Sequence, residues 1–423
     1  MGFRNSTLLA WRARMTAMPN IPHGRAIRDL ADAHVAALTE LDPFQATRLG
    51  LRDDRMRDLS PAGREAMDER LRRTLRELDA LDGGSAADIT DADERRCAKL
   101  LRDRLTSELA VSEIGEHFRT VRNIIGPLQA LRNAFTMMPT ATDDDWGLIA
   151  RRLAKVPDAI AGYRATLAEG VRRGLLAAPL QVNTQADQIA AWAATADGRG
   201  WFAGLSDGAE VSEGLRADLD RAGASAIGSL ADLRTWLLED YLPRAEGTPD
   251  GVGEQRYSVH VRWFSGADLD LAESYEWAWS EYRRLAKAER EQADLVLPGA
   301  TMTAAVDHLD SHGDIVAGVA EVRQRLQDII DRTLVALDGT HFDISEPMRR
   351  VESRIAPPGS AAAPYYSRPS SDFSRPGRTW LPVDGRTRFP MWRLLTTWYH
   401  ESVPGHHLQL GYWTTQAGRL SVW

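Results

Sequence analysis

Apolar residues recur every three or four positions over most of the first 340 residues, a spacing typical of amphipathic helices. The first stripe comprises Ile27, Leu30, Ala31, His34, Val35, Leu38 and Leu41. A second begins after Ser60, an N-cap followed by proline, and stops at Gly83 and Gly84. Thr90 with Asp93 resembles a capping box that opens a third. Further amphipathic runs cover 143–172, 212–241, 267–293 and 303–337. These patterns predict a long helical body.

Strand signals are few and lie mainly after residue 340. Residues 256–264 alternate in part but equally suit the approach to a helix, while 351–355 and 379–383 are two further candidates. Residues 356–378 are rich in Pro, Gly, Ser and Ala, which excludes a regular helix there. We predict one mainly α-helical domain over 1–423, with a helical body at 24–340, a loop-and-strand region at 341–390 and a final helix at 391–417.

Composition narrows the class of protein and of partner. The chain has 423 residues, of which 43% are hydrophobic and 26% charged, and this composition favours a folded globular protein. The net charge of −8 argues against nucleic acid and anionic membranes as partners. The single cysteine, Cys97, excludes an internal disulfide and a cysteine-built metal site, and its place on an apolar stripe indicates a small core residue. The oligomeric state is not readable.

No targeting segment is evident. The apolar run Leu8–Trp11 is shorter than the roughly 7–15 residues of a secretory signal. No stretch approaches the roughly 20 apolar residues of a membrane helix. We therefore expect a soluble, cytoplasmic protein.

Candidate chemistry is concentrated in the final helix, where His400 and Glu401 lie within an apolar face and His406 and His407 follow. Neutral imidazoles are good Zn²⁺ ligands, and a glutamate next to the first histidine can polarise a metal-bound water. The usual spacing H-E-x-x-H fails because position 404 is proline. On an unbroken helix, His407 would lie about 20° from the direction of His400 but about 10.5 Å along the axis, and His406 about 120° away.

Pro404 and Gly405 make an unbroken helix improbable, because proline removes a backbone donor and crowds the carbonyl of His400. A bulge there would return His406 to the place of the second ligand. We favour His406, with His407 either a ligand or a donor that supports a ligand or faces the substrate. Burying Glu401 and three imidazoles without a metal would be costly, which favours a metal site over ordinary packing.

The run Tyr399–Gln409, Y-H-E-S-V-P-G-H-H-L-Q, resembles the signature H-E-x-x-P-G-H-H-x-Q of the bacterial DUF885 family of zincin-like proteins. The loop with Tyr365 and Tyr366, the following Arg-Pro-Gly and the helical body also resemble that family. The resemblance implies a mostly α-helical metallohydrolase fold with bound Zn²⁺, His400 and His406 as metal ligands, and Glu401 as general base. The fold group implies a peptidase, hence a peptide or amide substrate.

The sequence departs from the family pattern after the second histidine. Zincins of this type take a third ligand, usually a glutamate, from a later helix, but the sixteen residues after His407 contain no Asp, Glu, His or Cys. We expect a chain truncated at its C-terminus, poor in metal and inactive, unless an upstream carboxylate such as Glu273, Glu276, Asp372 or Asp384 contributes. The alternative is a non-catalytic helical protein that keeps the fold without a complete metal site.

Other residues carry weaker signals. Tyr366 is a candidate to donate a hydrogen bond to the oxyanion of a hydrolysed carbonyl, although paired tyrosines more often anchor a loop. Five arginines lie close together in the sequence, and we interpret them as a solvated face and not as a site for a substrate carboxylate: Arg375, Arg378, Arg386, Arg388 and Arg393. His308 and His312 are interpreted as surface residues. The aromatic stretch of Tyr275, Trp277, Trp279 and Tyr282 is predicted to belong to the core.

Overall fold

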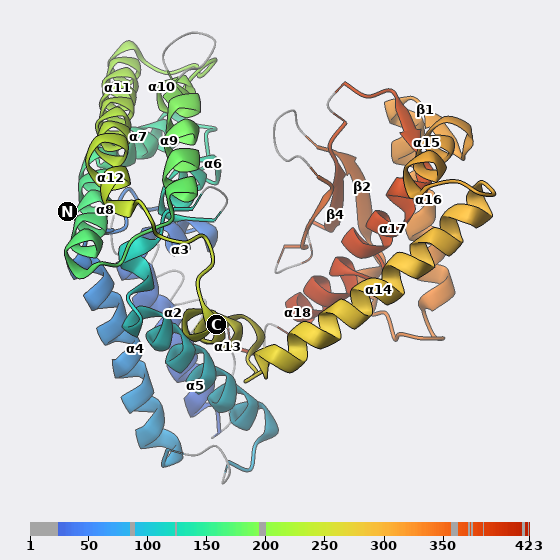
Figure 1. Cartoon of the computed structure of the whole chain (residues 1–423), viewed down its shortest axis with the longest axis horizontal. Coiled ribbons are helices and arrows are strands. Elements are labelled where there is room, and N and C mark those ends of the chain that lie inside the picture. Colours follow the sequence, from blue (N-terminus) through green and yellow to red (C-terminus); the bar gives the residue numbers. More distant parts are fainter. Residues whose placement is uncertain are drawn as a thin grey trace. The chain divides into compact units, whose positions relative to one another are not determined.

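The computed structural model is mainly α-helical with a few short strands, as predicted (Figure 1). It describes residues 24–423 apart from 85–88, 123–124, 194–199, 357–362, 371–372, 374, 384, 417–418 and 422. The N-terminal apolar run Leu8–Trp11 and the candidate ligands Asp372 and Asp384 lie outside the described residues. The chain divides after Leu269 into two compact units, which are described separately.

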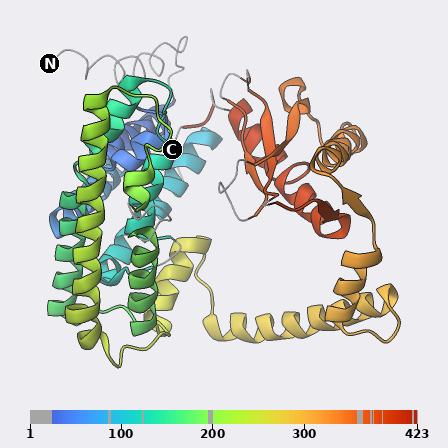
Figure 2. The same cartoon turned by 90° about the horizontal axis from the view of Figure 1, so that it is seen from above.

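The N-terminal unit is a bundle of helices. They are α2 (Ala26–Leu41), α3 (Pro43–Arg48), α4 (Pro61–Asp82), α5 (Ala92–Glu113), the 3₁₀ helix η2 (Glu116–Arg119), α6 (Pro127–Thr136), α7 (Asp143–Leu153), α8 (Val156–Arg173), α9 (Pro179–Ala193), α10 (Trp201–Gly204), α11 (Glu213–Trp236), the π-helical η3 (Leu237–Tyr241), α12 (Leu242–Ala245) and α13 (Glu254–Ser265). Helices α8, α9 and α11 run side by side in both views (Figures 1 and 2).

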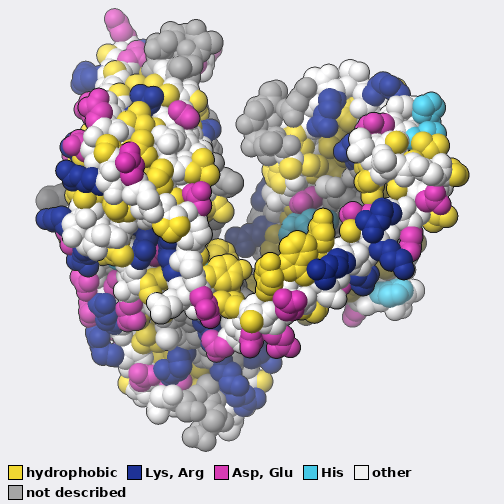
Figure 3. All heavy atoms as spheres, in the orientation of Figure 1, with side chains coloured by type: hydrophobic (Ala, Val, Ile, Leu, Met, Phe, Trp, Pro, Cys, Tyr) yellow, Lys and Arg dark blue, Asp and Glu magenta, His cyan; other side chains and the backbone are white. Residues whose placement is uncertain are grey.

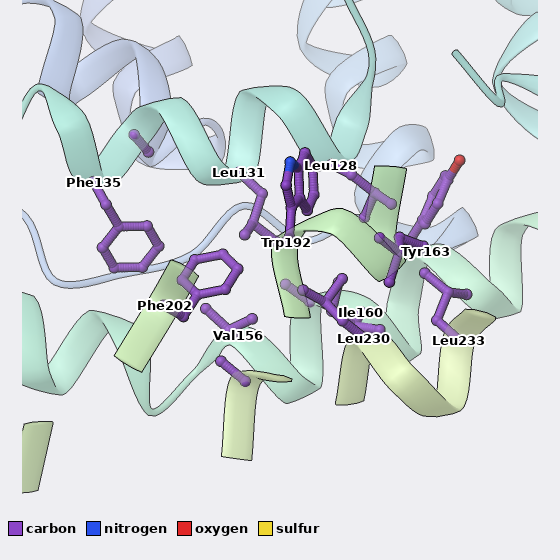
Figure 4. Close-up of a cluster of buried hydrophobic side chains, with 14 of the residues drawn as sticks. Leu128, Leu131, Phe135, Val156, Ile160, Tyr163, Trp192, Phe202, Leu230 and Leu233 are labelled. Carbon is purple, nitrogen blue, oxygen red and sulfur yellow. The ribbon is translucent and has the colours of Figure 1, made fainter. Parts of the chain in front are cut away.

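Two apolar clusters hold this unit together. The larger lies among α6 to α11, where side chains such as Leu131, Ile160 and Leu230 point toward one another (Figure 4). The smaller joins α2, α4 and α5, and Cys97 packs half-buried against it as expected. Each fully buried Leu or Ile contributes roughly 1.5–3 kcal/mol through the hydrophobic effect. The helical stripes recognised in the sequence are therefore the faces that meet in these clusters.

Most of the predicted helix boundaries agree with the structure. The hydroxyl of Ser60 accepts a hydrogen bond from the backbone of Gly63, and Gly83 ends α4 with a φ of 65°. The third helix differs by one residue: Asp91 rather than Thr90 is its N-cap, because the Asp91 carboxylate accepts from the amides of Asp93 and Glu94.

Residues 256–264 form a helix, not a strand. They lie within α13, which attaches to the rest of the N-terminal unit through polar contacts: the guanidinium of Arg256 donates twice to the buried carboxylate of Glu116 at 2.7 Å. The indole of Trp263 donates to Glu108 at 2.9 Å. The alternation in the sequence was misleading because α13 buries none of its residues and so has no fully apolar stripe.

The C-terminal unit combines helices with two small sheets. Its elements are α14 (Leu271–Val296), α15 (Met302–His312), β1 (Ile315–Ala317), α16 (Val319–Leu337), the 3₁₀ helix η4 (Glu346–Arg349), β2 (Val351–Ile355), β3 (Tyr365–Ser367), β4 (Gly377–Leu381), β5 (Arg388–Pro390), α17 (Met391–Glu401), the π-helical η5 (His407–Gly411) and α18 (Tyr412–Thr415). Strand β2 coincides with a predicted strand, and β4 overlaps the other one.

The larger sheet has the order β2-β4-β3, with β2 and β4 parallel and β3 and β4 antiparallel. The smaller sheet pairs β1 with β5 directly before α17. Apolar residues of α16, β2, β4 and α17 form the core of the unit, in which Trp398 of α17 is fully buried. Buried residues of α16, β2 and β4 thus share one core with Met391 and Trp398 of α17.

The aromatic stretch of α14 was predicted to be core, and this prediction is wrong. Tyr275, Trp277 and Tyr282 are each more than 60% exposed, and Trp279 is 42% exposed. Figure 3 shows hydrophobic side chains gathered on this helix. Of its 26 residues α14 buries only Ala293 among those described. An apolar stripe at helical spacing shows which residues share a face, but not whether another element covers that face.

Among the described residues, no helix combines the length and the apolar character that crossing a bilayer requires.

His34 occupies a buried place on the first predicted stripe. Its side chain is 1% exposed, and its Nδ1 lies 2.8 Å from the hydroxyl oxygen of Thr74 on α4. Burial lowers the pKa of His34 from 6.5 to about 4, with the charge of Arg70 as a smaller cause. The imidazole is therefore neutral in the folded N-terminal unit at neutral pH.

We expect the N-terminal unit to lose stability as the pH falls from 6.5 to 4. In this range the unfolded chain binds a proton at His34 that the folded unit does not, so the free energy of unfolding falls by up to about 3 kcal/mol. Denaturant unfolding followed by circular dichroism across this range measures the loss. His34→Gln should reduce the loss without removing it, because burial also lowers the pKa of His117 in the same unit to about 4. His312→Gln, at an exposed position, should leave the loss unchanged; equal slopes in all three proteins would contradict the assignment.

Candidate metal centre

Helix α17 carries the first half of the candidate centre and is anchored at its start. At its start, the amide of Met391 donates to the carbonyl of Asp314 at 2.8 Å, and Asp310 accepts from the side chains of Trp392 and Arg393. The helix ends at Glu401, because Ser402 adopts φ −122° and ψ −111°. Its last turn contains the consecutive residues His400 and Glu401.

The chain then folds back on that last turn. The amide of Gly405 donates to the carbonyl of Tyr399 at 2.9 Å, and the amide of His407 donates to the carbonyl of Ser402 at 2.9 Å. A Cβ atom on Gly405 would lie 1.9 Å from the carbonyl oxygen of His400, so only glycine allows this approach. The predicted break at Pro404 and Gly405 is therefore present.

This return brings His400, Glu401 and His406 together. The two imidazole rings are 4.7 Å apart between centroids. The Nε2 atom of His400 lies 3.8 Å from one carboxylate oxygen of Glu401, and the Nε2 atom of His406 lies 3.9 Å from the other. One ligand-type atom from each residue lies within 4.8 Å of the other two. The arrangement suits a cation that two nitrogens and an oxygen would share.

The three side chains differ in exposure. That of His400 is 66% exposed, that of His406 36% and that of Glu401 15%. The Nδ1 atom of His406 lies 3.4 Å from the amide oxygen of Gln409, a long contact in which the ring nitrogen is the donor. This leaves the lone pair of His406 on Nε2, the atom that faces Glu401. Metal-binding histidines commonly have such an oxygen partner on the other ring nitrogen.

His407, which the sequence analysis included among the metal ligands, is not brought to this cluster. Its side chain is 1% exposed, and Nε2 donates to the carbonyl oxygen of Met348 at 2.7 Å. Burial lowers the pKa of His407, so the ring is neutral and its Nδ1 carries a lone pair. Both nitrogens are used inside the protein, and neither is available to a metal.

Tyr366, the candidate oxyanion donor, is the second partner of His407. Its hydroxyl lies 2.8 Å from Nδ1 of His407, and since that nitrogen can only accept, the tyrosine donates its hydrogen to it. Burial raises the pKa of Tyr366, which keeps the phenol protonated. In this arrangement the hydrogen that an oxyanion would need is already used, so the structure favours the anchoring role for this tyrosine.

Two grooves flank α17 and the turn after it. One, of about 870 Å³, lies between α16 and α17 and is lined mainly by apolar side chains, with Leu395, Tyr399 and Pro404 among them. The other, of about 390 Å³, lies between η4 and η5. Neither groove has His400, Glu401 or His406 in its lining, so the candidate centre lies beside the grooves and not inside them.

The remaining candidates lie elsewhere. Among the described residues no further His, Cys, Asp or Glu joins the cluster, so Glu273 and Glu276 of α14 are not brought to it. Arg378 pairs with Glu352 at 3.0 Å, and Arg393 pairs with Asp310 at 2.7 Å.

His308 and His312 stack on α15 with ring centroids 4.8 Å apart. Within the described part of the chain no third ligand-type group accompanies them.

The sequence analysis assigned no role to three residues that shape the centre. Gln409 was detectable, since it lies three residues after His406 and shares its face of a helical turn. Met348 contributes only a backbone carbonyl, which no side-chain pattern reveals. Gly377 of β4 packs so closely that a Cβ atom would lie 2.3 Å from the hydroxyl of Tyr366 and 2.6 Å from Nδ1 of His407.

Comparison with known proteins identifies a family and a fold. Residues 43–423 match the family model DUF885, described as a bacterial protein of unknown function. No curated protein sequence matches the chain.

Two solved structures resemble this fold. The crystal structure of a proposed lipoprotein from Colwellia psychrerythraea has a TM-score of 0.70 at 16% identity, with 93% of this chain and 73% of that chain covered. A proposed lipoprotein of unknown function from Shewanella oneidensis has a TM-score of 0.65 at 14% identity, with 92% and 72% covered.

We expect Gly377→Ala to destabilise the C-terminal unit by about 1–3 kcal/mol, because the added methyl group collides with two hydrogen-bonded side chains that cannot move apart without losing their bond. Thermal unfolding measures the change. Gly228→Ala on α11 is the matched control, since its Cβ atom would meet no atom within 4 Å. An unchanged melting temperature in Gly377→Ala would show that the contact around His407 is looser than the structure has it.

Proposed function

We propose that this chain, which belongs to the DUF885 family of bacterial proteins of unknown function, binds Zn²⁺ through His400 and His406 and hydrolyses peptide or amide bonds. One observation supports the proposal above the others: the Nε2 atoms of both histidines face the same carboxylate, that of Glu401, across a break in the helix. Packing alone gives no reason for two imidazoles to converge on a carboxylate at a partly exposed position.

The donor set fits zinc in kind and nearly in spacing. Imidazole nitrogen and carboxylate oxygen are common zinc ligands, at about 2.0–2.2 Å from the ion, which places tetrahedral ligand atoms about 3.3 Å apart. The two nitrogen-to-oxygen distances of 3.8 and 3.9 Å exceed this by about half an ångström. Since neither distance is short enough for a hydrogen bond, the three groups leave one another's polar atoms available to a cation.

In the proposed hydrolysis, the zinc ion and the side chains of the protein have different roles. A zinc ion bound there would act as a Lewis acid toward a carbonyl and lower the pKa of water. His400 and His406 hold it as neutral donors. Glu401 takes the proton from the attacking water and passes it to the leaving amine nitrogen as the amide bond breaks. The low exposure of its carboxylate, 15%, limits competing contacts with solvent.

Glu401 has a second possible role, as a metal ligand. Its two oxygens lie at almost equal distances from the two imidazole nitrogens, which suits a ligand as well as a base. If it is a ligand, no further His, Cys, Asp or Glu of the described residues joins the cluster as a separate base. The protein is then a non-catalytic metal-binding member of the family. This is our second candidate function, and the Glu401 variant below distinguishes it from the first.

The site of action in the cell stays a prediction. The sequence predicts a cytoplasmic protein, whereas the two solved structures that resemble it are described as proposed lipoproteins. Their identity to this chain, 14–16%, supports a shared fold and carries no statement on location.

We expect zinc to bind weakly, because two histidines and at most one carboxylate of the described residues hold it. Titration calorimetry with added Zn²⁺ should give about one site per chain that extensive dialysis empties. His400→Ala and His406→Ala should each weaken binding at least about tenfold, since each removes a ligand. His341→Ala, which removes an exposed imidazole outside the cluster, should leave it unchanged. Equal affinities in all four proteins would contradict the assigned ligands.

Glu401→Gln tests the catalytic role. If Glu401 is the base, zinc affinity should change little while cleavage of a peptide library at saturating zinc falls by about 10²–10⁴-fold. A parallel fall in zinc affinity would identify Glu401 as a ligand. No cleavage by the wild-type protein at saturating zinc would contradict the hydrolase proposal and favour the non-catalytic candidate.

A further inference from the structure

His407 joins three segments of the C-terminal unit at one buried point. Its side chain donates to the carbonyl of Met348 in η4 and accepts from the hydroxyl of Tyr366 in β3, at 2.7 and 2.8 Å. Its own backbone amide donates to the carbonyl of Ser402, which follows α17. A buried imidazole with both nitrogens satisfied has one favourable orientation, because turning the ring would leave polar groups unpaired.

Two glycines, one on β4 and one on η5, leave little space around the side chains of Tyr366 and His407. On β4, Gly377 leaves no room for a side chain beside the Tyr366 hydroxyl and His407. On η5, a Cβ atom on Gly411 would lie 2.4 Å from the terminal methyl of Met348 and 3.8 Å from the ring of His407. The phenol and imidazole rings meet nearly edge to face, with centroids 5.7 Å apart. These contacts leave the imidazole little freedom.

His406 precedes this fixed residue and has little support of its own. Its side chain is 36% exposed, and within the described part of the chain its ring makes a hydrogen-bond contact with Gln409 alone, at 3.4 Å. Consecutive Cα atoms are about 3.8 Å apart, so holding His407 also fixes the backbone from which His406 extends. The two adjacent histidines of the motif thus have different surroundings. His406 is partly exposed and faces the cluster, whereas His407 is buried and hydrogen-bonded inside the protein.

We propose that His407, through its hydrogen bonds to Tyr366 and the Met348 carbonyl, is the positioning residue that holds His406 beside His400. This role rests on the proposed metal site, because His406 is held there as a ligand. The placement of His406 beside His400 is nevertheless already present in the metal-free protein. Tyr366 acts through His407 and not on the substrate. The pair therefore controls how well the second ligand is presented, without touching the metal.

The primary test reads the geometry directly. In metal-free protein with ¹³Cε1-labelled histidine, NMR should show a nuclear Overhauser contact between the rings of His400 and His406, whose centroids are 4.7 Å apart. His407→Ala should abolish this contact, and Tyr366→Phe should weaken it. His407→Gln should retain it, because the glutamine amide offers a donor and an acceptor at similar separation. A contact unchanged in a folded His407→Ala protein would overturn the proposal.

Zinc affinity gives the second readout. His407→Ala should weaken Zn²⁺ binding by about 10–100-fold, as loss of groups that orient metal ligands does elsewhere, and should change the visible spectrum of bound Co²⁺. His34→Ala is the control for general destabilisation, since His34 is equally buried and lies in the other unit. A lower melting temperature with unchanged affinity and spectrum in His407→Ala would overturn the positioning role.

The two proposals fail in different ways. Absence of zinc binding in the wild-type protein would contradict the proposed function, whereas the ring contact in metal-free protein still decides whether His407 positions His406. Comparing His407→Gln with His407→Met separates the hydrogen bonds from mere filling of space, because the two side chains are similar in size but only glutamine can form both bonds.

Discussion

The close approach of Gly405 to the last turn of α17 is the constraint on which the candidate centre depends. A Cβ atom at this position would lie 1.9 Å from the carbonyl oxygen of His400, so the backbone can return only with glycine there. The return shortens the distance that a straight helix would impose between the two histidines. It also explains why the spacing of this motif differs from that of an unbroken zinc-binding helix, in which a single turn separates the ligands.

A layer of buried polar contacts supports this return. The central strand β4 packs its glycine against Tyr366 and His407, and η4 offers the Met348 carbonyl from another direction. Such contacts are costly to leave incomplete, since an unpaired buried donor or acceptor loses about 1–3 kcal/mol. The sheet, η4 and η5 are therefore coupled, and the orientation of the exposed histidines follows from an interior that a metal never contacts.

The candidate centre belongs entirely to the C-terminal unit. Every residue assigned to it or to its support, including Asp310 and Asp314 that hold the start of α17, lies between α15 and η5. The N-terminal unit has its own apolar clusters and its own buried polar pairs, such as His34 with Thr74 and Glu116 with Arg256.

The sequence by itself determined the mainly helical fold, the helix stripes such as that of residues 27–41, the break at Pro404 and Gly405, and the histidines of the motif. Each of these is local: periodicity, caps and a proline act within a few residues. Tertiary structure alone decided that His407 turns inward, that Tyr366 anchors it and that the aromatic face of α14 is exposed. These outcomes depend on which distant backbone atoms lie nearby. Neither a backbone carbonyl such as that of Met348 nor the exposure of a helix face has a signature in the residue pattern.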